Sequence, residues 1–323
     1  MRLHVVSGKG GTGKTTVAAA MAIALATNGH RILLVEVEGR QGIARLFDTA
    51  PLPYAEEQIA VAPGAGEVFA LAIDPEAALL EYLDMFYNMR RAGNALRRLG
   101  AIDFATTIAP GLRDVLLTGK ASEAVQRRQK SGRPVYDAVV LDAPPTGRIA
   151  RFLNVTDEVA GLARVGPIKK QSDMVMGVIK SPRTAVHLTT LLEEMPVQEA
   201  IDGVADLRAN GLQPGAIVVN MTRQAGMSDV ELTAAADHSL DADELRAGLL
   251  AAALPRHVDL DKVTTALLAE AADHAARIDL ERDERARLTE CGQPMYELPM
   301  LAGGVDVAGL YSLAADLRNQ GLR

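Results

Sequence analysis

The chain has almost no cysteine, and this scarcity limits the kinds of site it can build. Its 323 residues include a single cysteine, Cys291, so no disulfide can form within the chain. A structural zinc site needs several thiolate or imidazole ligands at close spacing, and the sequence offers no such cluster. We therefore expect a reducing, cytoplasmic setting and no zinc.

Long apolar runs are lacking as well. No uninterrupted apolar stretch approaches the roughly 20 residues that a membrane-spanning helix needs. The first residues, MRLHVVS, run directly into a strand pattern without a basic and apolar leader, so we expect no signal peptide. These absences predict a cytoplasmic protein whose contact with any membrane is peripheral.

An excess of positive charge is also missing. The 34 Lys and Arg residues stand against 41 Asp and Glu residues, which gives a formal net charge of −7. Because nucleic acid is bound through basic surfaces, we expect no nucleic-acid partner. The length is ample for a sizeable core without disulfides or metals.

Apolar stretches that end in turns alternate with helical patterns along the chain. Residues 14–28 are rich in alanine and form a helical pattern closed by Gly29. Several strand patterns are nearly continuous apolar runs, as expected for strands buried on both faces. This alternation predicts an α/β fold with a doubly wound, mostly parallel sheet. The predicted strands lie at residues 2–7, 30–39, 68–73, 136–147, 215–220 and 294–300.

Two stretches break the alternation. Residues 75–133 and 153–211 are mostly helical by pattern, and we predict that they form one α-helical subdomain inserted into a single domain, 1–323. A third helical stretch, 228–290, is typical of amphipathic helices on the outside of a sheet. The predicted core sheet takes up the segments 1–74, 134–152 and 212–323.

Methionines gather in the predicted helical subdomain. Methionine is adaptable and recurs on surfaces that accept varied apolar partners. For any single methionine, packing in a core is the more ordinary role. An apolar groove and a helical core layer are thus two interpretations of the same five residues, Met85, Met89, Met174, Met176 and Met195.

A glycine-rich loop near the N-terminus carries the clearest chemical signal. Residues 8–15, GKGGTGKT, match GxxxxGK[ST] and lie between a predicted strand and a predicted helix. In that context the backbone N–H groups of the loop converge on a phosphate at the helix N-terminus. Lys14 would neutralise the β- and γ-phosphates of ATP, and the Thr15 hydroxyl would hold Mg²⁺. The predicted nucleotide-binding residues of the loop are Gly8, Gly10, Gly11, Thr12, Gly13, Lys14, Thr15 and Thr16.

Carboxylates follow two of the predicted strands. Asp142 ends the strand in VVLDAPPTG and is the expected second Mg²⁺ ligand. The turn after it, residues 144–147, is placed to sense the γ-phosphate and to move on hydrolysis. Glu36 and Glu38 lie at the end of the strand LLVEVEG, on the same side by strand alternation. Either could orient the attacking water or be a solvated loop charge.

The loop and its surroundings resemble a known family. KGGTGKTT with its early Lys9, then Glu38, then DAPPTGRIARFL at 142–153, resemble the deviant Walker-A ATPases. Within these, the chain is most similar to a bacterial branch of the arsenite-pump (ArsA) and tail-anchored-protein-targeting ATPases, over most of its length. Glu38 falls on the catalytic aspartate of that family. Lys9 resembles a lysine that reaches across a dimer interface, which implies catalytic roles for Lys9, Lys14, Glu38 and Asp142 in hydrolysing Mg²⁺-bound ATP.

The same resemblance implies where the base of the nucleotide lies. IVVN ends in Asn220, which matches an adenine-reading asparagine. ELPML, at 297–301, matches a loop whose backbone flanks the base through Pro299 and Met300. Glu193 falls on a carboxylate that reaches the nucleotide. Because this chain has one P-loop, the resemblance also implies a second ATPase subunit, either another copy or a related chain.

Three outputs of such an ATPase are conceivable. The first, which we favour, is the binding and release of a hydrophobic or membrane-protein segment between helical subdomains. The second, an arsenite-pump subunit, conflicts with the single cysteine, because trivalent arsenic is held by several thiolates. The third, a partition or division-site positioning ATPase, conflicts with the long helical stretches and the acidic charge. Glu38 in place of aspartate also leaves open a slow, nucleotide-gated scaffold or the regulatory half of a heterodimer.

Overall fold

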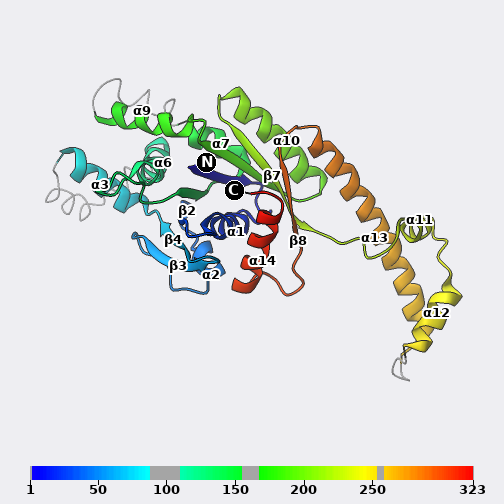
Figure 1. The fold of residues 1–323 in the computed structure, drawn as a ribbon. Helices are drawn as coiled ribbons and strands as arrows, with labels where there is room; N and C mark the ends of the chain where they lie inside the picture. Colours follow the sequence, from blue (N-terminus) through cyan, green and yellow to red (C-terminus); the bar gives the residue numbers. More distant parts are fainter. Residues whose placement is uncertain (1, 88–109, 155–166, 253–257, 323) are drawn as a thin grey trace.

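In the described residues, the core is an eight-stranded sheet with one antiparallel edge. The computed structural model describes residues 2–87, 110–154, 167–252 and 258–322. The strands follow the order β3-β4-β2-β5-β1-β6-β7-β8, and every neighbouring pair except β3 with β4 is parallel (Figure 1). Their bounds are β1 Leu3–Gly8, β2 Arg31–Glu36, β3 Glu57–Ala62, β4 Gly66–Ala72, β5 Ala138–Asp142, β6 Thr184–Thr190, β7 Pro214–Thr222 and β8 Met295–Pro299.

Helices cover both faces of the sheet, which confirms the predicted doubly wound α/β class (Figure 1). α1 and α14 pack together on one face, and α6, α7, α9 and α10 lie on the other. Among the described helices, none is both long and apolar enough to cross a membrane. The helices are α1 Lys14–Ala26, α2 Gly42–Leu46, α3 Pro75–Tyr87, α6 Pro110–Gln126, α7 Thr146–Leu153, α9 Pro167–Ile179, α10 Glu194–Ala209, α11 Asp229–Ala236, α12 Ala242–Ala251, α13 Leu260–Thr289 and α14 Val307–Asn319.

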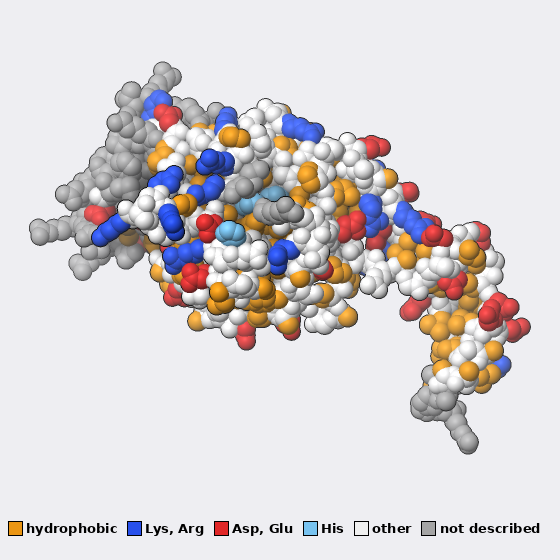
Figure 2. Space-filling view, in the orientation of Figure 1, with side chains coloured by type: hydrophobic (Ala, Val, Ile, Leu, Met, Phe, Trp, Pro, Cys, Tyr) orange, Lys and Arg blue, Asp and Glu red, His pale blue; other side chains and the backbone are white. Residues whose placement is uncertain are grey.

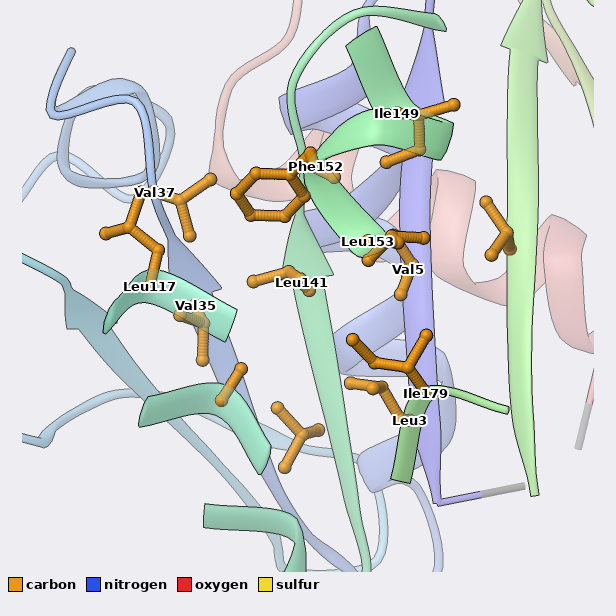
Figure 3. Close-up of a cluster of buried hydrophobic side chains, with 14 of the residues drawn as sticks. Leu3, Val5, Val35, Val37, Leu117, Leu141, Ile149, Phe152, Leu153 and Ile179 are labelled. Carbon is orange, nitrogen blue, oxygen red and sulfur yellow. The ribbon is translucent and has the colours of Figure 1, made fainter. Parts of the chain in front are cut away.

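The central strands are buried on both faces, so their side chains alternate between two cores. In β1, Leu3 and Val5 join one cluster and Val6 joins the other. Figure 3 shows the first cluster, in which Phe152 of α7 packs near Leu141 of β5. Each large side chain buried in this way contributes roughly 1.5–3 kcal/mol. Burial on both faces explains why the sequence of these strands is nearly continuously apolar.

The predicted helical stretch 153–211 is wrong at residues 184–190, which form a strand, whereas residues 194–209 are helical as predicted. Residues 184–190, TAVHLTT, form β6, which lies between β1 and β7 with all seven residues buried. α10 follows and packs on the sheet. Three threonines and a histidine interrupt the apolar run in β6, although Thr and Val are β-branched and suit a pleated surface. Residues 88–109 and 155–166 of the predicted subdomain lie outside the described residues.

The five methionines of the predicted subdomain do not share one surface. Met176 is buried in the core, whereas Met174 and Met195 are exposed by 38% and 65%. Met89 and the side chain of Met85 lie outside the described part of the chain. Met174 belongs to α9 and Met195 to α10. A single methionine-lined groove would therefore have to combine Met174 of α9 with Met195 of α10, which lie on separate helices.

Residues 228–290 are largely helical as predicted, but most of them do not lie on the sheet. The C-terminal end of α13 joins the main core through Leu288. α11 and α12 pack along the rest of α13, and the three helices form an arm that projects from the body (Figure 1). The apolar cluster that holds α11 on α13 contains Leu232, Ala235, Ala275 and Ile278.

Two histidines meet inside the sheet. His4 of β1 and His187 of β6 are buried, and His4 Nδ1 lies 3.1 Å from His187 Nε2. The backbone N–H of Ala216 donates to His187 Nδ1 at 3.1 Å, so His187 carries its proton on Nε2 and donates it to His4. Both rings must therefore be neutral. Burial lowers the pKa of His187 to about 4, and burial with the neighbouring ring holds the pKa of His4 well below its usual value.

We predict that mild acid destabilises the protein through this pair. The unfolded chain protonates its histidines near pH 6.5, whereas folded His187 stays neutral down to about pH 4. The stability that neutral His187 contributes is complete above pH 6.5 and declines by up to about 1.4 kcal/mol for each pH unit below it. Chemical denaturation between pH 8 and pH 5 should show a shallower pH dependence in His187→Gln than in the wild type. His238→Gln, at an exposed site, should keep the wild-type dependence. An unchanged slope in His187→Gln would contradict the prediction.

Candidate nucleotide site

The glycine loop lies at the carboxyl end of β1. β1 ends at Gly8 and α1 begins at Lys14, so the loop opens a helix whose first backbone N–H groups have no partner within the helix. A Cβ on Gly8 would lie 2.2 Å from the carbonyl oxygen of Thr189, and a Cβ on Gly13 would lie 2.3 Å from Asn220 Nδ2. Gly13 also has a φ of 83°, which side chains disfavour. The loop needs glycine where it packs on β6 and β7.

Side-chain hydrogen bonds fix the path of the loop. Thr12 Oγ1 donates to the carbonyl oxygen of Lys9 at 2.8 Å, and Asn220 Nδ2 donates to the carbonyl oxygen of Thr12 at 2.9 Å. Asn220 is buried on β7. The asparagine that was predicted to read adenine therefore supports the loop backbone, and its contact with a base stays a prediction.

A hydroxyl and a carboxylate meet beside the loop. Thr15 Oγ1, in the first turn of α1, donates to Asp142 Oδ2 at 2.7 Å. Burial raises the pKa of Asp142 to about 7, with the charge of Glu36 raising it and the Thr15 hydrogen bond lowering it. A divalent cation at this point would meet hard oxygen ligands and would stabilise a carboxylate that burial disfavours. The donor set fits Mg²⁺.

Glu36 and Glu38 occupy different environments. Glu36 ends β2 in register with Asp142 and is only 2% exposed. Its Oε2 accepts from the backbone N–H of Ile43 at 3.1 Å, while Oε1 is buried with no hydrogen-bond partner among the described residues. An unsatisfied buried oxygen here suits a water molecule in a cation shell. Glu38 lies beyond the end of β2, where strand alternation does not apply, and its Oε2 is 3.8 Å from Arg40 Nε.

A carboxylate of α10 joins the loop to the segment after β5. Glu199 accepts from Thr146 Oγ1 at 2.5 Å, and Lys9 Nζ lies 4.0 Å from its other oxygen. Thr146 is the first residue of α7. The sequence did not single out Glu199, and its one signal was that Glu193, predicted to reach the nucleotide, immediately precedes the same helix. Lys14 makes no ion pair within the part of the chain that the structure describes.

The remaining predicted nucleotide-binding residues lie away from these contacts. Glu193 is the N-cap residue of α10 and is exposed. Pro299 ends β8 and Met300, just after it, is exposed. No hydrogen bond among the described residues joins any of these three side chains to the loop, so their contacts with a nucleotide stay predictions.

The arrangement of sheet, loop and strand-end aspartate defines a class of protein. A glycine-rich loop follows the central strand of a mainly parallel sheet, opens a helix and places a lysine and a hydroxyl beside a strand-end carboxylate. These are the components of a P-loop nucleoside triphosphatase.

Comparison with known proteins narrows the class. The family model for anion-transporting ATPases, ArsA, matches residues 1–182. The chain is 53% identical over 323 residues to the ATPase BagA of Mycobacterium tuberculosis (strain ATCC 25618 / H37Rv), which covers 100% of this chain and 94% of that protein. It is 28% identical over 181 residues to the ATPase get3 of Schizosaccharomyces pombe, which covers 54% of this chain and 51% of that protein. The chain belongs to the ArsA family of anion-transporting ATPases and hydrolyses ATP.

We predict that Gly13→Ala damages the loop and that Gly10→Ala leaves the fold intact. An added Cβ at Gly13 meets Asn220 and forces a strained backbone, whereas one at Gly10 meets nothing within 4 Å. Gly13→Ala should lower stability by about 1–3 kcal/mol and weaken nucleotide binding, while Gly10→Ala should keep the wild-type stability. Thermal denaturation and titration with a fluorescent nucleotide measure the two effects. Equal stability of the two variants would refute the packing argument.

We predict that Asp142→Asn stabilises the nucleotide-free chain at pH 8. The same change should abolish the dependence of ATP turnover on Mg²⁺. The folded pKa of Asp142 is about 7, above its unfolded value of 3.8, so its charged form destabilises the fold at pH 8 and this penalty disappears as pH falls toward 4. The amide should add on the order of 2–4 kcal/mol at pH 8 and much less at pH 4.5. Urea denaturation at both pH values tests this, with the exposed Asp283→Asn as control. A gain independent of pH would count against a buried charge.

Proposed function

We propose that the chain is a Mg²⁺-dependent ATPase switch that works as a dimer, in which Lys9 of each subunit serves the nucleotide of the other. The observation that carries the proposal is the environment of Lys9. Its ammonium lies 4.0 Å from Glu199 and its side chain is 33% exposed, so it is held loosely at the edge of its own loop. A lysine in that place is free to exchange Glu199 for the phosphates of a facing subunit.

In this proposal the loop residues divide the work of hydrolysis. The backbone N–H groups of the loop and the Lys14 ammonium bind the phosphates. Thr15 and Asp142 hold the cation, which supplies positive charge to the phosphate oxygens when it is bound. Glu38, partly exposed just beyond the end of β2, orients the attacking water. Lys9 of the facing subunit stabilises charge that develops in the transition state.

The segment between β5 and α7 transmits the state of the nucleotide. Ser7 Oγ donates to the carbonyl oxygen of Pro144 at 2.6 Å, and Thr146 donates to Glu199 at 2.5 Å. Phe152, farther along α7, is buried in the core that α6 and α9 share. A shift of this segment when the γ-phosphate leaves would therefore move the helical layer over the sheet.

The output that we propose is the handling of a hydrophobic or membrane-protein segment in the cytoplasm, by two copies of this chain or by this chain and a related one. The resemblance to the targeting ATPases and the exposed Met174 on α9 support it. A trivalent-arsenic site is not supported, because the chain has one cysteine and burial raises the pKa of the Cys291 thiol. An arsenical cargo would need thiolates from elsewhere.

A mixing experiment tests Lys9 directly. Lys9→Ala keeps an intact loop but lacks the lysine that crosses, and Lys14→Ala keeps Lys9 but has a defective loop. Each variant alone should be nearly inactive in steady-state ATP turnover. An equal mixture should recover roughly a quarter of the wild-type rate, because half of the dimers are mixed and each of these has one complete site.

Concentration series supply the control. Wild-type specific activity should rise with protein concentration as light scattering reports dimers, and Lys130→Ala, at an exposed site, should behave like the wild type. Full activity of Lys9→Ala at every concentration would refute the crossing lysine. Wild-type chain that binds ATP without turnover would instead point to a related chain as the obligatory partner.

A further inference from the structure

A polar cavity lies at the amino ends of β1 and β6, opposite the glycine loop. Its volume is about 400 Å³, within the range of small-molecule sites. It is bounded by the start of β1, the ends of α6 and α9, and the residues just before β6. Arg2 and Gly8 are at opposite ends of β1, so the cavity and the loop are about 20 Å apart. The cavity is therefore not part of the ATP site.

Three arginines line this cavity from three different segments. Arg2 immediately precedes β1, Arg128 follows α6 and Arg183 lies between α9 and β6. In Figure 2, Lys and Arg side chains gather between the N-terminus and the ends of these helices. Burial lowers the pKa of Arg2, and the positive charges of Arg128 and Arg183 lower it further. Arg128 and Arg183 thus each repel Arg2 across the cavity.

The positive charge is not neutralised from within the described residues. No carboxylate there lies within ion-pair distance of Arg2, Arg128 or Arg183. Asp137 acts on Arg2 through space, but its Oδ2 accepts from the backbone N–H of Arg31 at 2.8 Å and lies 3.6 Å from His30 Nδ1. A small anion would supply the missing negative charge.

Hydrogen-bond donors in the cavity are also incompletely used. Arg2 is anchored through one terminal nitrogen to the carbonyl oxygens of Val125 and Tyr136, at 2.6 and 3.1 Å. Its Nε is buried and has no partner among the described residues. Ser181 adds a hydroxyl to the wall. Three guanidiniums and a hydroxyl thus line one space, and these are donors that suit a tetrahedral oxyanion.

A glycine keeps one wall of the cavity open. Gly177 lies within α9, where glycine is less stabilising than alanine by roughly 0.5–1 kcal/mol. A Cβ at this position would meet nothing within 4 Å, and the residue lines the cavity. A large side chain at this position has open space before it and can enter the cavity.

We infer that this cavity, which we call the arginine cavity, binds a phosphate group, either of a small soluble phosphate ester or of a lipid headgroup. The ligand bridges Arg2 of the sheet to Arg128 after α6 and to Arg183 after α9. It relieves the repulsion among the three and fastens the helical layer to the amino edge of the sheet. This site is independent of the proposed dimer switch.

The test uses the full chain with its glycine loop saturated by Mg²⁺ and a non-hydrolysable ATP analogue, so that added phosphate cannot enter the ATP site. Isothermal titration with inorganic phosphate and with glycerol 3-phosphate should show one further site per chain. Arg183→Gln and Arg128→Gln should weaken it by about tenfold or more. Gly177→Leu should weaken it similarly while keeping all three arginines. Arg133→Gln removes the same charge from an exposed site outside the cavity and should bind as the wild type does.

The outcomes distinguish the two sources of phosphate and show when the proposed site is wrong. Binding of the soluble probes supports a phosphate ester. A lipid headgroup is supported if the wild-type chain floats with phosphatidylglycerol vesicles but does not bind the soluble probes. In that case Arg183→Gln and Gly177→Leu should abolish the flotation. Equal weakening by Arg133→Gln would show diffuse surface charge and overturn the site, as would wild-type chain that binds neither probe nor vesicles. Unchanged ATP turnover in Arg183→Gln confirms that the variant is folded.

Discussion

The close packing of the glycine loop on β6 and β7 is the constraint on which the rest of the site depends. Gly8 and Gly13 leave no room for a side chain against Thr189 and Asn220, so the loop can take one path only. That path sets the first turn of α1 and therefore the position of Thr15. Its hydroxyl then meets Asp142 at the end of the adjacent strand β5. The functional groups of the site are thus positioned by the ends of strands that the sheet holds in place.

Charge changes along the central strands from their carboxyl ends to their amino ends. At the carboxyl edge, Asp142 and Glu36 are buried carboxylates near the loop. Between the two ends, His4 of β1 and His187 of β6 must stay neutral. At the amino ends, Arg2 precedes β1 and Arg183 precedes β6, and no carboxylate of the described residues forms an ion pair with either. The buried carboxylates and these arginines are thus separated by about the length of a strand.

The fold class and the loop could be predicted from sequence because each depends on a local pattern. GKGGTGKT is contiguous, and the apolar runs of β2 and β5 are visible without any tertiary information. β6 could not be predicted in the same way, because its polar residues interrupt the apolar pattern and His187 is satisfied by partners far away in the chain, such as the N–H of Ala216. Glu199 shows the same limit, since Thr146 and Lys9 reach it only through folding. The amphipathic pattern of residues 228–290 also could not show whether these helices pack on the sheet or on one another. In the structure, α11 and α12 pack on α13.

The arm formed by α11, α12 and α13 extends far from the body, so a small rotation at its base produces a large displacement at its tip. α13 has 30 residues, so it is about 45 Å long, and it joins the body near Leu288 at one end only. Arg285 and Arg287 fasten that end to Glu297 of β8 and Gln198 of α10. α10 also carries Glu199, so the base of the arm and the Lys9 contact share one helix. A rotation of about 10° at this base displaces the far tip by roughly 8 Å, which makes the arm a lever that magnifies small movements of α10.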